Sequence, residues 1–120
     1  LKIIYPGLKN HPQHKMMMMS MNNDFGFGGM LVIDAQTKEK ANKLMEEMQN
    51  NNIGYLAVSL GFYKTLFSAP SLSTSSEIPE EERKQIGLTD SLVRISIGLD
   101  CDIDETYQAM LKCIKKVNII

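Results

Sequence analysis

The stretch Ser91-Leu92-Val93-Arg94-Ile95-Ser96-Ile97-Gly98 says most about the architecture of this chain. Successive side chains of a strand point to opposite faces, so Val93, Ile95 and Ile97 share one apolar face. Arg94 stands on the other face. Alternation of this kind is typical of an antiparallel sheet that packs one face against a core. We therefore expect a sheet with helices packed on one face.

Two amphipathic helices are predicted to supply that packing. The first places Ala41, Leu44, Met45 and Met48 at i, i+3, i+4 and i+7, and the run Asn50-Asn51-Asn52 stops it. The second begins at Asp102, with Glu105 three residues later as in a capping box. Its apolar stripe consists of Ile103, Tyr107, Met110, Leu111, Ile114 and Val117.

The remaining elements are shorter. Strands are predicted at residues 1–5, 30–33 and 55–58, the second of them covered on both faces, and helices at 12–21 and from Pro79 to Gly87. Residues 62–69 are predicted to be extended or irregular, and residues 71–76 to form a loop. The fold class that follows is an α/β (α+β) two-layer sandwich, with a small, mostly antiparallel sheet of about four strands. Residues 1–120 form one domain. Because Leu1 already opens a strand, we expect a piece of a longer protein.

Composition excludes several classes of function. The chain has 120 residues, with 13 basic against 14 acidic side chains and a net charge of -1, so it lacks the basic surface that binds nucleic acid. It contains no apolar run of the roughly 18 residues that a membrane span needs. Its two cysteines, Cys101 and Cys113, form no C-x-x-C pair, which favours a reducing, cytoplasmic setting.

Several possible ligand-binding patterns have better structural explanations. Gly26 and Gly28 could open a dinucleotide-binding loop, but the third glycine is missing and a strand follows, so we expect these glycines to let the backbone approach another surface. His11 and His14 lack a third metal ligand and are expected at a helix entry on the surface. The Met16–Met19 run with Met21 is expected to fill the core flexibly rather than bind copper.

The lysines and Arg94 are candidates for different kinds of chemistry. Lys9, Lys38 and Lys64 are rejected as imine-forming residues because nothing near them in the sequence would lower an ammonium pKa. Arg94 is different, since an arginine within an apolar strand is costly unless its planar fork meets a carboxylate or phosphate. On spacing alone, a structural ion pair or an exposed sheet edge is the favoured explanation of Arg94.

Separated stretches resemble one family, the pyridoxal-phosphate-dependent enzymes of cysteine and methionine metabolism and transsulfuration, in their C-terminal domain. The matching pieces are Tyr5-Pro6-Gly7-Leu8, His11-Pro12-Gln13-His14, Gly26-Phe27-Gly28-Gly29-Met30, Ala57-Val58-Ser59-Leu60-Gly61, Ser73-Thr74-Ser75-Ser76-Glu77, and Gly87-Leu88 leading to residues 92–98. The stretch Ser59-Leu60-Gly61-Phe62-Tyr63 is most similar to the methionine γ-lyase branch. Lys64 departs from the glutamate usual there.

The resemblance implies a role for four residues. Arg94 matches the arginine that grips the α-carboxylate of the substrate. Ser59 and Leu60 match the pair beside the reactive centre that positions the substrate, and Thr74 matches a threonine that supports the arginine pocket. No residue of this chain is implied to be catalytic, to bind the cofactor or to bind a metal.

The resemblance also implies what lies outside the chain. In this family the pyridoxal 5'-phosphate and its lysine belong to a large domain of a fold-type I enzyme that would precede Leu1. We therefore expect the chain alone to bind no cofactor and to be inactive, and the complete enzyme to be a cytoplasmic homo-oligomer, a tetramer, acting on a sulfur-containing amino acid. Methionine γ-lyase activity is favoured. The alternatives are cystathionine γ-lyase, cystathionine γ-synthase or O-acetylhomoserine sulfhydrylase activity, and a truncated homologue that acts as an interaction module.

Overall fold

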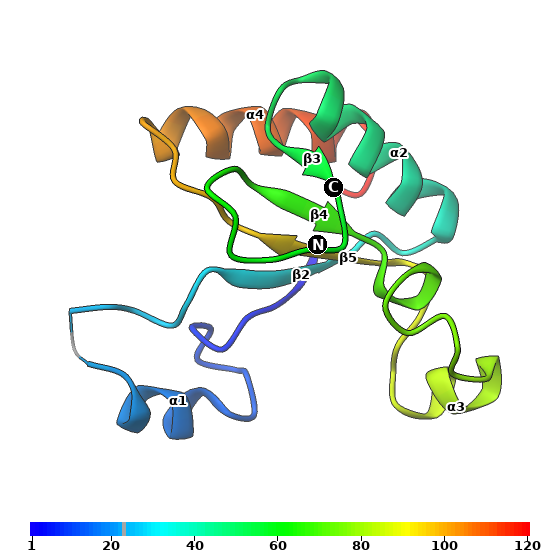
Figure 1. The fold of residues 1–120 in the computed structure, drawn as a ribbon, viewed down its shortest axis with the longest axis horizontal. Coiled ribbons are helices and arrows are strands. Elements are labelled where there is room, and N and C mark those ends of the chain that lie inside the picture. The colour runs from blue at the N-terminus through cyan, green and yellow to red at the C-terminus, as the bar shows by residue number, and fades with distance from the viewer. Residues whose placement is uncertain (23) are drawn as a thin grey trace.

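A five-stranded sheet forms the centre of the molecule. A computed structural model describes residues 1–22 and 24–120. The strands are β1 (Lys2–Ile4), β2 (Met30–Asp34), β3 (Tyr55–Leu56), β4 (Leu66–Ser68) and β5 (Leu92–Ser96), in the order β1-β2-β5-β4-β3 (Figure 1). Among the described strands, the edge pair β3 and β4 is parallel and the other neighbouring pairs are antiparallel. The mostly antiparallel prediction is confirmed, and the strand number is five rather than about four.

The register of the sheet separates its two faces. Val93 lies opposite Ile33, and Ile95 lies between Leu31 and Phe67. These side chains point to the same face and belong to the hydrophobic core. Arg94 lies between Val32 and Ser68 on the other face, which we call the open face.

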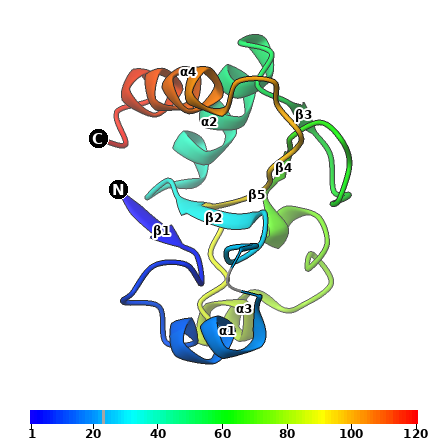
Figure 2. The same ribbon diagram turned by 90° about the vertical axis from the view of Figure 1, so that its left-hand side faces the viewer.

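Two helices cover the apolar face of the sheet. Helix α2 (Lys38–Asn50) buries the four predicted positions of its stripe, and α4 (Ile103–Lys116) buries Cys113 and Ile114. Figure 2 shows both helices side by side above the sheet. The predicted sandwich is confirmed, and its two longest helices pack on one face of the sheet.

The other helical segments lie beyond the open face (Figure 2). They are α1 (His14–Ser20), the 3-10 turn η1 (Pro70–Leu72) and α3 (Glu80–Gln85). Helix α1 buries none of its residues, and Met19 is 80% exposed. The expectation that the methionine run fills the core is therefore wrong, because α1 lies away from the core cluster.

Other local predictions need correction as well. Only one face of β2 is packed, since Ile33 is 2% and Met30 37% exposed, so the strand is not covered on both faces. The helix predicted from Pro12 begins at His14. The region predicted as extended or irregular contains the extended strand β4, whereas the predicted loop after it begins as the 3-10 turn η1.

The glycines before β2 serve a conformational purpose. Gly26 and Gly28 have φ values of +64° and +84°, and a Cβ placed on either would meet nothing within 4 Å. They permit left-handed backbone in a loop, and the expected close approach to another surface does not occur at either position. The imidazole of His14 stacks on Phe27, with ring centroids 4.9 Å apart, and its Nδ1 lies 2.8 Å from the Pro6 carbonyl oxygen.

Two further predictions concern the solvent environment. No helix within the described parts of the chain is long and apolar enough to cross a bilayer. Cys101 is exposed and Cys113 is buried, and both are free thiols. Burial raises the pKa of the Cys113 thiol.

Candidate functional site

Arg94 occupies the middle of the sheet on its open face. It is the one charged residue of β5, and hydrogen-bonded strands flank it on both sides. Side chains alternate along this strand, and Val93 and Ile95, the neighbours of Arg94 on the opposite face, are 0% exposed. The half-buried side chain of Arg94 is therefore held on this face by the same pattern that builds the core.

A loop between β3 and β4 contacts the guanidinium. The Nη2 atom of Arg94 donates to the carbonyl oxygens of Val58, at 2.5 Å, and Ser59, at 3.2 Å. Within the described residues both bonds use this single nitrogen. Within the described residues Nε and Nη1 donate no hydrogen bond, so their N–H groups remain available to a carboxylate.

Two of the predicted site residues, Ser59 and Leu60, lie in this loop. Ser59 contacts Arg94 through its backbone carbonyl, and its side chain is exposed. Leu60 follows directly and is 59% exposed. The structure thus brings Ser59 and Arg94 together and places Leu60 beside them.

Thr74 lies apart from this contact. It is an exposed residue in the turns that follow η1, and in the described part of the chain no hydrogen bond joins it to Arg94. The structure therefore does not bring Thr74 into direct contact with the guanidinium.

Ser96 also contacts the loop between β3 and β4, and the sequence did not single it out as a site residue. Its hydroxyl oxygen accepts a hydrogen bond from the Gly61 backbone N–H at 3.2 Å. The available signal was its position, since Ser96 lies two residues after Arg94 and therefore on the same face of the strand.

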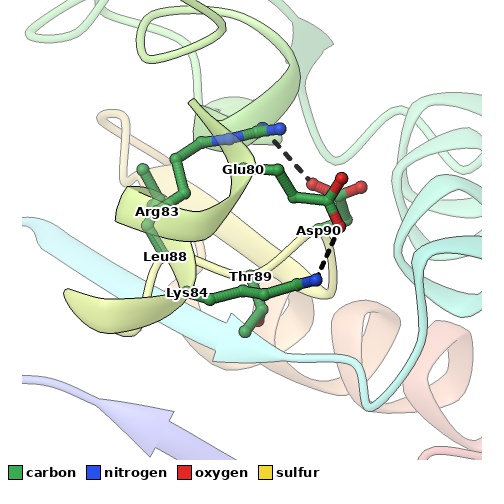
Figure 3. A pocket seen from close by; sticks show the side chains of 6 residues that line it. All are labelled: Glu80, Arg83, Lys84, Leu88, Thr89 and Asp90. Carbon is green, nitrogen blue, oxygen red and sulfur yellow. Dashed lines mark ion pairs between the residues drawn. The ribbon is translucent and has the colours of Figure 1, made fainter. Parts of the chain in front are cut away.

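A separate pocket of about 160 Å³ lies between α3 and the start of β5. Figure 3 shows the six residues that line it, including Arg83, Lys84 and Asp90. Arg83 pairs with Asp90 at 3.5 Å and donates to the carbonyl oxygen of Ser71. The hydrogen bond that Lys84 donates to the Glu80 carboxylate, together with the negative charge of that carboxylate, raises the pKa of Lys84. These contacts tie α3 to η1 and to the segment that precedes β5.

Comparison with known proteins identifies the relatives of this chain. Residues 1–114 match the family described as Cys/Met metabolism PLP-dependent enzyme. The chain belongs to this family. It is 50% identical to methionine gamma-lyase from Arabidopsis thaliana over 99 residues, which cover 82% of the chain and 22% of that relative. It is 36% identical to cystathionine gamma-lyase from Dictyostelium discoideum over 116 residues, or 93% of the chain and 28% of that relative.

Solved structures of the same family share the fold. Cystathionine gamma-lyase from yeast superposes with a TM-score of 0.84 at 31% identity, over 98% of this chain and 29% of the other. A Campylobacter jejuni protein assigned as an O-acetylhomoserine (thiol)-lyase gives a TM-score of 0.82 at 26% identity, over 96% and 26% of the two chains. That structure contains N'-pyridoxyl-lysine-5'-monophosphate. The chain thus has the fold of part of a fold-type I enzyme and spans about a quarter of the length of these relatives.

The family depends on pyridoxal phosphate, so the lysine-bearing pocket can be tested against that cofactor. A pyridoxal site needs an amine that forms an imine, and an acidic or basic partner for the ring nitrogen. Lys84 is instead paired with Glu80 at 2.8 Å, its pKa is raised, and no aromatic residue lines the pocket. The carboxylates of Glu80 and Asp90 would also repel a phosphate. The residues of this pocket do not fit the cofactor.

Proposed function

We propose that residues 1–120 are the C-terminal, substrate-carboxylate-binding domain of a pyridoxal-phosphate-dependent carbon–sulfur lyase. The observation that carries the proposal is the Arg94 guanidinium on the open face, held by the carbonyls of Val58 and Ser59. In the complete enzyme the large cofactor-binding domain would come from outside this chain. The complete enzyme would be a cytoplasmic homo-oligomer.

The chemistry of Arg94 suits an α-carboxylate. A guanidinium is a cation whose N–H groups donate to carboxylate oxygens. The two carbonyls hold Nη2, so the plane of the guanidinium and the directions of its other N–H donors are fixed. A substrate held in this way is bound in one orientation, which reduces the entropic cost of reaction.

The other resemblance-based residues take supporting roles in this proposal. The exposed hydroxyl of Ser59 and the backbone at Leu60 would position the bound amino acid next to the guanidinium. Thr74 would support the pocket from the turns after η1, once the complete enzyme is assembled.

Methionine γ-lyase activity is the form of the proposal that the relatives favour, because of the 50% identity to the Arabidopsis thaliana enzyme. The complete enzyme would convert methionine and water to methanethiol, ammonia and 2-oxobutanoate. Its cofactor would supply the electron sink that permits loss of protons from the substrate. The second candidate is cystathionine γ-lyase activity, favoured by the 36% identity to the Dictyostelium discoideum enzyme.

A hybrid enzyme tests the proposal. In the hybrid, the matching C-terminal segment of the Arabidopsis thaliana relative is replaced by residues 1–120 of this chain. We expect the hybrid to release thiol from methionine faster than from cystathionine. Arg94→Ala should lower kcat/KM for methionine about a hundredfold, which corresponds to about 3 kcal/mol for loss of a charged partner. Arg94→Lys should give a kcat/KM between those of the parent and of Arg94→Ala, because it keeps the charge but loses the planar set of N–H donors.

The control is Lys112→Ala, which removes an exposed cation from α4 on the opposite side of the sheet. This variant should leave kcat/KM unchanged. A folded hybrid that binds cofactor and whose kcat/KM is unaffected by Arg94→Ala would make Arg94 structural. A folded hybrid with no activity on any of the sulfur amino acids would favour a non-catalytic interaction module.

A further inference from the structure

The loop that carries Ser59 is fastened to β5 at a second point beside Arg94. Ser96 lies on the same face of β5 as Arg94, is 5% exposed, and accepts the Gly61 N–H at 3.2 Å. Gly61 has a φ of +69°, and a Cβ there would meet nothing within 4 Å. The glycine is therefore needed for its left-handed backbone, which L side chains adopt at a cost.

Backbone contacts hold the far end of the loop. The N–H of Leu99 donates to the Tyr63 carbonyl at 2.8 Å, and the N–H of Gly98 donates to the Thr65 hydroxyl at 2.9 Å. The segment between these contacts and Ser59 is mostly exposed. Among the described residues, the Gly61–Ser96 bond is the hydrogen bond that holds the middle of this loop.

We propose that Ser96 is a positioning residue for the carboxylate site, acting through Gly61 on the two carbonyls that hold Arg94. If the middle of the loop moved, the carbonyls of Val58 and Ser59 would move with it, and the guanidinium would lose its fixed direction. When a positioning group is displaced even slightly, the substrate binds less tightly in the productive geometry. The inference rests on the proposed function of Arg94.

Ser68 provides a matched control on the same sheet face. It is the cross-strand partner of Arg94 on β4 and is 3% exposed. In the described structure its hydroxyl oxygen is buried without a hydrogen-bond partner. Removing this hydroxyl therefore changes a buried serine next to Arg94 without releasing the loop.

The test uses two measurements on four variants. The first is the hydrogen-exchange rate of the Gly61 amide in the 120-residue chain, followed by NMR. The second is KM and kcat for methionine in the hybrid enzyme. We expect Ser96→Ala and Ser96→Val to speed Gly61 exchange several-fold. They should also raise KM about 3- to 10-fold with kcat nearly unchanged, the size expected for one lost hydrogen bond. Ser96→Thr and Ser68→Ala should resemble the parent in both measurements.

The Thr and Val variants have the same shape and differ only in the hydroxyl, so their comparison isolates the hydrogen bond even if Ser96→Ala does not fold. Equal Gly61 exchange in these two variants would overturn the inference, as would faster exchange without a rise in KM. An unchanged KM in Arg94→Ala would instead overturn the proposed function, while the exchange rates would still show whether Ser96 holds the loop.

Discussion

At the scale of single residues, two glycines lie close against the backbone of Thr65. This residue is 0% exposed and lies between two glycines. A Cβ on Gly54 would lie 2.0 Å from the Thr65 carbonyl oxygen, and one on Gly98 would lie 2.4 Å from the Thr65 nitrogen. Backbone approaches backbone here, so flexible side chains cannot relieve a clash. The two glycines fix where the site loop ends.

Replacing Gly98 should therefore destabilise the whole chain. We expect Gly98→Ala to lower the free energy of unfolding by about 3 kcal/mol, the upper part of the range for overpacking. Gly29→Ala is the matched control, because its nearest contact would be an ordinary 3.6 Å. Urea denaturation of both variants measures the difference. Equal midpoints would show that the backbone around Thr65 can move apart without cost.

At the scale of elements, α4 depends on its first turn. The Asp102 carboxylate accepts hydrogen bonds from the backbone N–H groups of Asp104 and Glu105, each at 3.0 Å. These are two of the amides that a helix leaves unpaired at its start. Lys115 and Lys116 lie in the last turn, near the negative end of the helix dipole. The predicted capping role of Asp102 is confirmed.

Loss of this cap should weaken the helix and the domain with it. Asp102→Ala is expected to lower the free energy of unfolding by about 1 kcal/mol. Asp104→Ala removes an acid of the same charge that accepts no capping bond among the described residues, so it should cost only about 0.3 kcal/mol. The two variants can be compared by urea denaturation followed by circular dichroism. A larger loss for Asp104→Ala would mean that charge, rather than capping, stabilises the start of α4.

Elements with a strong periodic pattern could be predicted from sequence, and the short elements β1, β2, β3 and α3 could be located from apolar runs and turn residues. Helices α2 and α4 show the 3.6-residue repeat, and β5 shows strict alternation, since each packs one face against the core. Strand β4 was predicted only as extended or irregular chain, because all three of its residues are buried, which removes any alternation. The Met16–Met19 run was misinterpreted because hydrophobicity alone does not reveal whether a helix reaches the core.

The candidate site shows the same division. Arg94 could be singled out because an arginine in an apolar strand is costly, and its face follows from alternation. Its contact with Ser59 could not be derived from spacing, since it depends on how a loop 35 residues away in sequence returns to β5. Ser96 was passed over for a similar reason, because its partner is a backbone N–H that carries no sequence signature.

At the scale of the whole molecule, the open face differs from the helix-covered face. Apolar side chains near the Arg94 loop are exposed, with Leu60 at 59% and Leu99 at 85%. The chain spans 22% of its Arabidopsis thaliana relative. In the proposed enzyme, the remaining protein would supply the cofactor and cover this face, so that Arg94 would bind the carboxylate away from bulk water, where a charged hydrogen bond is stronger.

The division of labour between the two parts predicts where the cofactor lysine lies. Several lysines of this chain are already engaged, since Lys84 pairs with Glu80, Lys116 with Glu47, and Lys40 donates to the Asn118 carbonyl. A protonated, paired ammonium is a poor nucleophile for imine formation. We expect borohydride reduction of the chain with equimolar pyridoxal phosphate to leave no stoichiometric pyridoxyl-lysine, as measured by intact mass. The same treatment of the hybrid enzyme should yield one adduct, and peptide mapping should place it outside residues 1–120. A stoichiometric adduct on a single lysine of this chain would contradict the assignment of cofactor binding to the other part of the enzyme.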